Sequence, residues 1–396
     1  MNSMKILLCA FGMALVVATG SAVRGDDGVV PFDSGIAIND PDQFNWDVFA
    51  AINQPAGVMA HPADVRWETW ASDPDTFPPK GKSPQWPDPE NACKQLTRNV
   101  QRAAIQTDRI RIFVNPFPNL DDKGNPLPDQ QETRRNRATF DFIVGNNLWN
   151  IAGLKAAFAS AAAIQAPVPS IEVKADWFPA VAGDEATFHV NTDCTGLKWK
   201  LVSLHVITKA LPNWTWATFE HVSNPGRCDY IGCADHFGAT QPVTKPTDDA
   251  NPAGAMLTVG SVYPAADSCT KTKAVLDPFA ANGLDPRVWS NYCLKGSQVD
   301  FTDSTGQPIR LGNSVTEAGF VRTSSCMSCH ARASVDAKGI PNLFPGFIAT
   351  SQAPGEPAVG PVGTPLPTWF VSQDVNGLPP YFKQTDFIWG VGAVQQ

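Results

Sequence analysis

Two cysteines and a histidine form the pattern in this chain whose residue types and spacing most clearly predict chemistry. Cys326-Met327-Ser328-Cys329-His330 has the C-x-x-C-H spacing of a c-type haem attachment site. Each thiol of such a pair adds across one vinyl group of the porphyrin, and the two intervening residues span the distance between the vinyls. The histidine then lies beneath the ring, where its imidazole takes one axial position on the iron. The motif therefore predicts one covalently bound haem c, attached at Cys326 and Cys329, with His330 as the proximal iron ligand.

Two other kinds of site use closely spaced cysteines. A thioredoxin-like redox pair opens a helix after a strand in a βαβ unit, and no such unit precedes Cys326. A zinc site needs four ligands, normally with a second close pair. Cys228, Cys233 and His236 have the spacing C-x4-C-x2-H but lack a fourth ligand nearby, so a disulfide between the two cysteines is the better interpretation.

The ligand on the other side of the iron has to come from upstream, because Met327 and His330 are the last methionine and histidine in the chain. Otherwise the position is open, or is filled by another atom such as a lysine amine. The upstream methionines and histidines considered are Met59, His61, His189, His205, His221, His236 and Met256.

His205 and His221 are the candidate distal ligands, because each lies in a strong strand pattern. A hairpin centred near Leu211 places both on one face, too far apart to bind one iron, whereas a slip of one residue in register places them on opposite faces. For each, the alternative is a hydrogen-bonded core histidine or a contact with a haem propionate. Glu220 could act as an acid or base, but alternation along the strand points it away from His221.

The first 25 residues resemble a secretory signal. Lys5 supplies a positive start, Ile6 to Gly20 is an apolar stretch too short for a comfortable membrane span, and Gly20-Ser21-Ala22 is a plausible cleavage site. No later segment is apolar enough to cross a bilayer. We therefore expect a mature protein without a membrane span, exported to the periplasm, where c-type haem is attached in bacteria.

The remaining cysteines agree with an oxidising compartment. Outside the signal and the motif there are six cysteines, and an even number suggests disulfides. Sequence alone cannot choose their connectivity, and local guesses pair Cys228 with Cys233 and Cys269 with Cys293, which leaves Cys93 with Cys194.

The net charge limits the classes of partner that we expect. Loss of Lys5 and Arg24 with the signal takes the formal net charge from −8 to −10. An acidic surface argues against nucleic acid and anionic membranes as partners and leaves a redox partner protein or a small electron donor or acceptor.

Hydrophobic patterns and turn residues predict the elements. Helices are expected at 46–53, 92–107, 132–147 and 151–164, with one continuous helix from 316 to 332 through the motif, and strands at 109–114, 170–177, 186–191, 197–208 and 214–222. Residues 286–300 are expected to form one more helix or strand.

Together these elements predict an α+β fold with an antiparallel, sandwich-like β-rich core, flanking helices, and long loops rich in proline and tryptophan. The chain divides into a signal (1–25), a loop-rich and helical part (26–165), a β-rich core (166–310), and a haem-attachment segment with a proline-rich tail (311–396), and parts of these can belong to one compact domain.

Four segments together resemble a group of bacterial exported proteins usually labelled only "cytochrome c family protein". The segments are Trp46-Asp47-x-Phe49-x-Ala51-x-Asn53, Leu204-His205-Val206, Trp216-Ala217-Thr218-Phe219-Glu220-His221-Val222, and Ser325 with the motif. The resemblance spans most of the mature chain and implies one covalent haem and a periplasmic location, without a known substrate. The late motif after a β-rich body is also similar in layout to the P460 cytochromes. Those are shorter, and their additional lysine–haem link has no clear counterpart here beyond Lys174.

Three functions fit these observations. The first is a periplasmic mono-haem cytochrome that transfers single electrons. The second is a haem-dependent oxidoreductase, such as a peroxidase, an oxygenase or a P460-like enzyme, with an open sixth position, which the length of the chain favours because a simple electron carrier needs far fewer residues. The third is a haem-based sensor or a subunit of a redox complex.

Overall fold

The computed structural model describes residues 30, 32–57, 63–88, 130–224, 227–228, 231–240, 269–317, 324–342, 363–365, 370 and 382–393. Within them, the helices are α1 (Ser34–Asn39), α2 (Pro41–Ile52), α3 (Asp73–Thr76), α5 (Arg137–Gly145), α6 (Ile151–Ala159), α7 (Lys273–Ala281), α8 (Pro286–Trp289) and α9 (Cys326–His330), with 3-10 helices η1 (Arg66–Thr69), η2 (Asp184–Ala186) and η6 (Trp389–Ala393). The strands are β1 (Ala71–Ser72), β2 (Gln130–Arg135), β3 (Ile171–Pro179), β4 (Val190–Thr192), β5 (Lys198–Thr208), β6 (Thr215–His221), β7 (Tyr292–Gln298), β8 (Ser334–Val335), β9 (Pro341–Asn342) and β10 (Lys383–Gln384).

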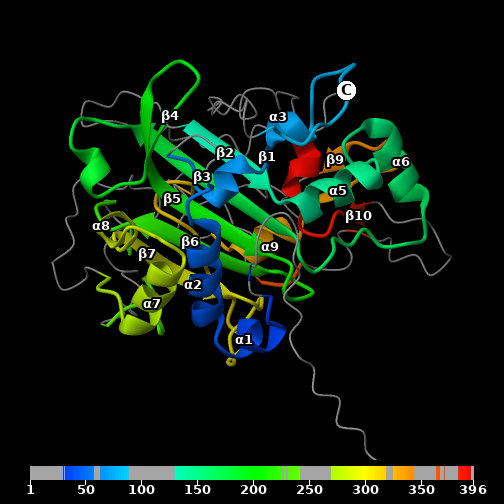
Figure 1. Cartoon of the computed structure of the whole chain (residues 1–396). Coiled ribbons are helices and arrows are strands. Elements are labelled where there is room, and N and C mark those ends of the chain that lie inside the picture. Colours follow the sequence, from blue (N-terminus) through cyan, green and yellow to red (C-terminus); the bar gives the residue numbers. More distant parts are fainter. Residues whose placement is uncertain are drawn as a thin grey trace, which may run out of the picture.

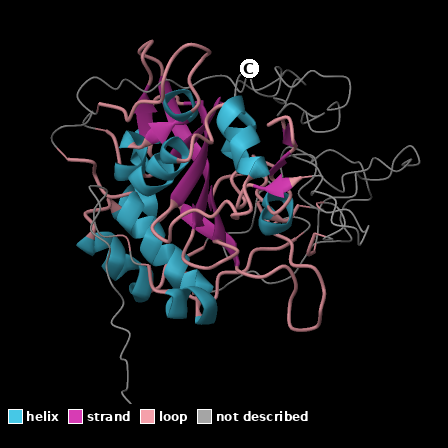
Figure 2. Ribbon diagram, turned by 90° about the vertical axis from the view of Figure 1, so that its right-hand side faces the viewer, coloured by secondary structure: helices cyan, strands magenta, loops and turns pink. Residues whose placement is uncertain are grey.

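An antiparallel sheet of seven strands forms the centre of the molecule. Its order is β1-β2-β3-β5-β6-β7, with β4 also paired to β5, and helices lie on both sides of it (Figure 2). A smaller sheet has the order β10-β8-β9. The predicted α+β class with an antiparallel core is therefore confirmed. None of the helices in the described part of the chain is long and apolar enough to cross a membrane.

The first face of the large sheet is apolar and is covered by α2 and α7. In Figure 1, α2 crosses in front of β6 and β7. Phe49 of α2 is fully buried, and its ring centre lies 4.3 Å from that of Phe219 on β6 and 5.9 Å from that of Phe279 on α7. This cluster of aromatic rings joins the N-terminal helix to strands that follow it by more than a hundred residues.

The second face is unusually polar for a buried surface. On β3, Asp176 accepts hydrogen bonds from Ser203 (2.8 Å) and from Thr316. On β6, Glu220 accepts from the backbone N–H of Ser314 (2.9 Å) and pairs with Lys295 (3.3 Å). These contacts fix the segment that contains Ser314 and Thr316 across the sheet, upstream of the motif, because each buried polar group needs a partner.

Several predicted elements have different bounds. The predicted helix at 132–147 is wrong in its first third: β2 continues to Arg135, whose buried guanidinium binds Glu172 on β3 (2.9 Å). The helix α5 begins only after Asn136, whose side chain accepts from the N–H of Thr139. At 186–191, a 3-10 turn precedes the short strand β4.

The helix predicted at 316–332 is also too long. In its described part the only helix is α9, and residues 318–323 lie outside the described residues. At 46–53 the helix begins earlier than expected, because α2 starts at Pro41 and is capped by Asp40. At 286–300 the chain forms both a helix, α8, and a strand, β7. The predicted signal at 1–25 and the elements predicted at 92–107 and 109–114 lie outside the described residues.

Two of the three guessed disulfides are confirmed. Cys228 pairs with Cys233, and Cys269 pairs with Cys293. Cys194 is disulfide-bonded, while Cys93, its predicted partner, lies outside the described residues.

Candidate functional site

The motif forms the short helix α9, whose side chains differ in burial. Met327 and Ser328 are fully buried and face the core, whereas Cys326, Cys329 and His330 are only partly buried. Residues three and four apart share one face of a helix, so the two thiols and the imidazole project together. This common face is the arrangement that covalent attachment of a porphyrin requires.

Hydrogen bonds to two neighbouring segments hold α9 in place. Cys326 donates its backbone N–H (3.1 Å) and its thiol (3.3 Å) to the carbonyl of Leu311, and the N–H of Met327 donates to the side chain of Gln298 on β7 (3.1 Å). Neither Cys326 nor Cys329 takes part in a disulfide.

His330 is oriented by a backbone carbonyl from the C-terminal part of the chain. Its Nδ1 lies 2.9 Å from the carbonyl oxygen of Phe387. A carbonyl can only accept, so Nδ1 carries the proton and Nε2 keeps its lone pair free for a metal. The rings of Trp216 and Trp389 lie 4.5 and 5.5 Å from the imidazole. Burial among these groups lowers the pKa of His330 to about 3, despite the bond to Phe387, so the ring is neutral, which is the form that can bind a metal.

The two thiols are not activated for disulfide exchange. Burial raises the pKa of Cys326 well above its usual value, with a further contribution from Glu317, and burial raises the pKa of Cys329 to about 12. A redox-active C-x-x-C pair needs a lowered pKa, so these thiols do not suit a thioredoxin-like reaction. Nor does the described part of the chain bring together three or more His, Cys, Asp or Glu side chains to hold a bare metal ion.

His205 lies on the same face of the sheet as the motif. It pairs with Lys174 on β3 and with Thr218 on β6. The residue is buried (6% exposed), and its Nε2 makes no hydrogen bond, although Oε1 of Glu317 lies 3.4 Å away. Nε2 thus lies within ion-pair distance of a buried carboxylate without making a well-formed hydrogen bond to it.

Glu317 and Lys174 complete a charged cluster with His205. Burial opposes ionisation of Glu317, but His205 and Lys174 outweigh it and lower the pKa of the carboxyl, whose Oε2 also accepts from the N–H of Asn313 (2.6 Å). Lys174, His205 and Glu317 all act electrostatically on His330. The cluster therefore lies within electrostatic reach of the imidazole of His330.

His221 lies on the opposite face, because the hairpin has the second of the two registers considered, which is shifted by one residue from a centre at Leu211. His205 pairs with Thr218, not Ala217, and Ser203 pairs with Glu220. Trp214 is the reason: it adopts a left-handed conformation (φ 62°) and belongs to the turn, which adds one residue to the expected connection. The two histidines are consequently on opposite faces of the sheet.

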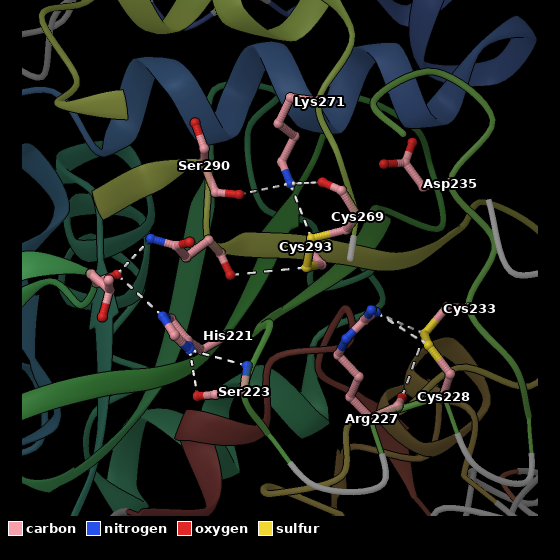
Figure 3. The surroundings of a disulfide bond; sticks show 12 residues. His221, Ser223, Arg227, Cys228, Cys233, Asp235, Cys269, Lys271, Ser290 and Cys293 are labelled. Atoms are coloured by element: carbon pink, nitrogen blue, oxygen red, sulfur yellow. Dashed lines mark hydrogen bonds between the residues drawn. A yellow bond between two sulfur atoms is a disulfide. The ribbon is translucent and has the colours of Figure 1, made fainter. Parts of the chain in front are cut away.

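Both ring nitrogens of His221 are occupied. Nδ1 accepts from the backbone N–H (3.2 Å) and the hydroxyl (2.7 Å) of Ser223, so the proton is on Nε2, which donates to the carbonyl of Thr187 (3.1 Å). The ring stacks on Phe188 at 3.5 Å. Figure 3 shows His221 and Ser223 in the neighbourhood of both disulfides. These contacts describe a core histidine and leave no lone pair for iron.

The other sequence candidates have separate roles. Nε2 of His189 lies 2.9 Å from a carboxylate oxygen of Glu68 within the first-face core. His236 is exposed and donates its backbone N–H to Asp42. Glu220 faces away from His221, as alternation predicted, and is paired with Lys295. Met59, His61 and Met256 lie outside the described residues.

Sequence reasoning missed Glu317 and Phe387. Glu317 lies in a loop with no periodic pattern, and Phe387 contributes a backbone carbonyl, which no side-chain motif can reveal. Lys174 carries one usable signal: it is a lysine within an otherwise apolar strand pattern, which places a charge on a buried face.

The donor set fits a c-type haem. Two unpaired thiols and a neutral imidazole share one face of α9, and a buried imidazole nitrogen without a hydrogen bond lies on the sheet face toward which the motif packs. Comparisons of the chain with protein-family models, with curated proteins and with solved structures found no match.

Proposed function

We propose that this protein is a mono-haem c-type cytochrome that transfers single electrons in the periplasm. Cys326 and Cys329 would hold the haem through thioether bonds, and His330 and His205 would supply the two imidazole ligands of its iron. When bound, the haem supplies a one-electron Fe(III)/Fe(II) couple. The observation that carries the proposal is the bond from Nδ1 of His330 to the carbonyl of Phe387, because it leaves Nε2 as the lone pair that an axial ligand needs.

The burial of His205 on the same sheet face as the motif supports the distal assignment. Its Nε2 makes no hydrogen bond and lies 3.4 Å from Oε1 of Glu317, so an iron ligand at Nε2 would replace that long ion pair. Two imidazole ligands also favour rapid electron transfer, because the iron then changes oxidation state with little rearrangement. The disulfides Cys228–Cys233 and Cys269–Cys293 agree with maturation in an oxidising compartment.

Covalent attachment is the first prediction. The chain is produced with its own leader in a bacterium that matures c-type cytochromes, and the purified protein is denatured, run on a gel stained for haem peroxidase activity, and weighed by mass spectrometry. We expect a stained band and the mass of one porphyrin. Cys326→Ser and Cys329→Ser each remove one thioether and should lower the stained haem several-fold, with complete loss in the double variant.

Met327→Leu is the matched control, since it changes the same helix without touching a thiol and nearly conserves volume in the buried pocket. It should retain haem. An unstained wild-type protein whose mass lacks the porphyrin would contradict the proposed function.

A second function, a haem-dependent oxidoreductase with an open sixth position, is favoured by one specific observation. Lys174 and Glu317 lie beside His205, and paired acid and base groups of this kind serve general acid–base catalysis. In this alternative His205 stays off the iron, and the cluster handles protons of a small bound substrate such as a peroxide.

The spin state separates the two functions and is the second prediction. We expect the reduced wild-type protein to be low-spin and its absorption spectrum to be unchanged by carbon monoxide. His205→Ala should become high-spin and bind the gas, whereas His221→Gln, on the opposite face, should behave as wild type. A wild-type spectrum that shifts with carbon monoxide would favour the oxidoreductase. An unchanged low-spin spectrum in His205→Ala would exclude His205 as the ligand.

A further inference from the structure

The loop that contacts His330 has an unusual backbone. Asp386 (φ 52°) and Phe387 (φ 67°) are consecutive non-glycine residues in the left-handed region. Side chains disfavour this conformation, so it persists only where surrounding contacts determine it, and such residues gather at functional sites. The loop therefore requires a specific anchor.

The carboxylate of Asp386 is that anchor. Its Oδ1 accepts from Nζ of Lys209 (2.6 Å), and its Oδ2 accepts from the backbone N–H of Ala166 (2.7 Å). Nζ of Lys209 also donates to the carbonyl of Pro212 (2.8 Å). Both charged side chains are buried. The ion pair thus ties the loop to the β5–β6 turn, and the hydrogen bond from Ala166 ties it to the segment before β3.

The next residue, Phe387, contacts the motif directly. The carbonyl of Phe387 accepts from Nδ1 of His330 at 2.9 Å. The ring of Phe387 packs 5.8 Å from that of Trp216, which itself contacts the imidazole. The direction of this carbonyl is set by the two left-handed residues, and their conformation is set by Asp386.

We propose that Lys209 and Asp386 form a positioning pair for the proximal histidine, which sets the strength of the bond from His330 to Phe387 and thereby the reduction potential of the haem. This inference rests on the proposed function. A hydrogen bond that draws on the Nδ1 proton increases the basicity of Nε2, and a more basic ligand stabilises the oxidised iron. Neither Lys209 nor Asp386 contacts the iron or a substrate.

Redox titration of the haem-loaded protein, followed by its absorption spectrum, is the third prediction. Asp386→Asn and Lys209→Met should raise the reduction potential, because the carbonyl moves and the bond to His330 weakens. Lys209→Arg retains the charge and should restore a potential near that of wild type. Asp386→Gly offers a second route if Asp386→Asn fails to fold, since glycine tolerates the left-handed backbone while losing the carboxylate.

The matched control is Asp184→Asn, which breaks the Lys200–Asp184 ion pair (3.0 Å) near the other end of β5. It should leave the potential unchanged even where it lowers the thermal midpoint. Haem-loaded, folded variants at Asp386 and Lys209 with the potential of wild type would overturn the positioning role alone. A wild-type protein without covalent haem would overturn the proposed function and this inference with it.

Discussion

The imidazole of His221 is held in one protonation state by its neighbours. The backbone N–H of Ser223 points at Nδ1, so a proton on that nitrogen would face another donor. Burial is the main reason that the pKa of His221 falls from 6.5 to about 4, although its bond to Thr187 acts in the other direction. The folded chain thus keeps the ring neutral in a range where an exposed histidine is charged.

This state makes stability depend on pH, which is the fourth prediction. Between about pH 6.5 and 4, His221 binds a proton in the unfolded chain but not in the folded chain, so acidification favours unfolding. The free energy of unfolding should fall by up to about 1.4 kcal/mol per pH unit from this group. Urea denaturation at several pH values measures the slope. His221→Gln removes the titration and should flatten the slope within this window; equal slopes in both proteins would count against it.

At the scale of elements, α2 contributes the aromatic centre of the first-face core. Phe49 contacts Trp46, Phe219, Phe279, Trp289 and Tyr292. Because these rings come from α2, α7, α8, β6 and β7, one side chain joins five elements.

Truncation of that side chain is the fifth prediction. Phe49→Ala should lower the free energy of unfolding by about 3–5 kcal/mol, since it removes apolar contacts and leaves a cavity that rigid rings cannot fill. Chemical denaturation followed by tryptophan fluorescence measures the change. Ile38→Ala, at an exposed position of α1 (59% exposed), is the control and should change stability by less than about 0.5 kcal/mol. Similar losses in both variants would argue against this account of the core.

The hairpin illustrates what local patterns can and cannot predict. Strands β5 and β6 were predictable, because long runs of β-branched and aromatic residues flank a turn. Their register was not, because Trp214 looks like a strand residue while its backbone belongs to the turn. One residue in the turn decided which histidine shares a face with the motif.

For the whole molecule, contacts distant in sequence decide the arrangement. The common face of the two thiols and the imidazole was predictable, because it depends on local spacing alone. The position of α2 on the sheet was not predictable, because it is fixed by contacts between residues far apart in the sequence. One example is the hydrogen bond from Asn45 to Ser297 (2.9 Å), which are 252 positions apart. Strands β1 and β2, from the part expected to be helical and loop-rich, also join the edge of the central sheet.

The distance along the chain between His330 and its carbonyl partner has a consequence for biogenesis. Phe387 follows His330 by 57 positions, so in the exported cytochrome that we propose the motif would leave the translocon well before that partner. During this interval the imidazole would be free to rotate and the thiols would be accessible to a maturation enzyme. The bond to Phe387 would then form, and orient His330, only after the haem is attached.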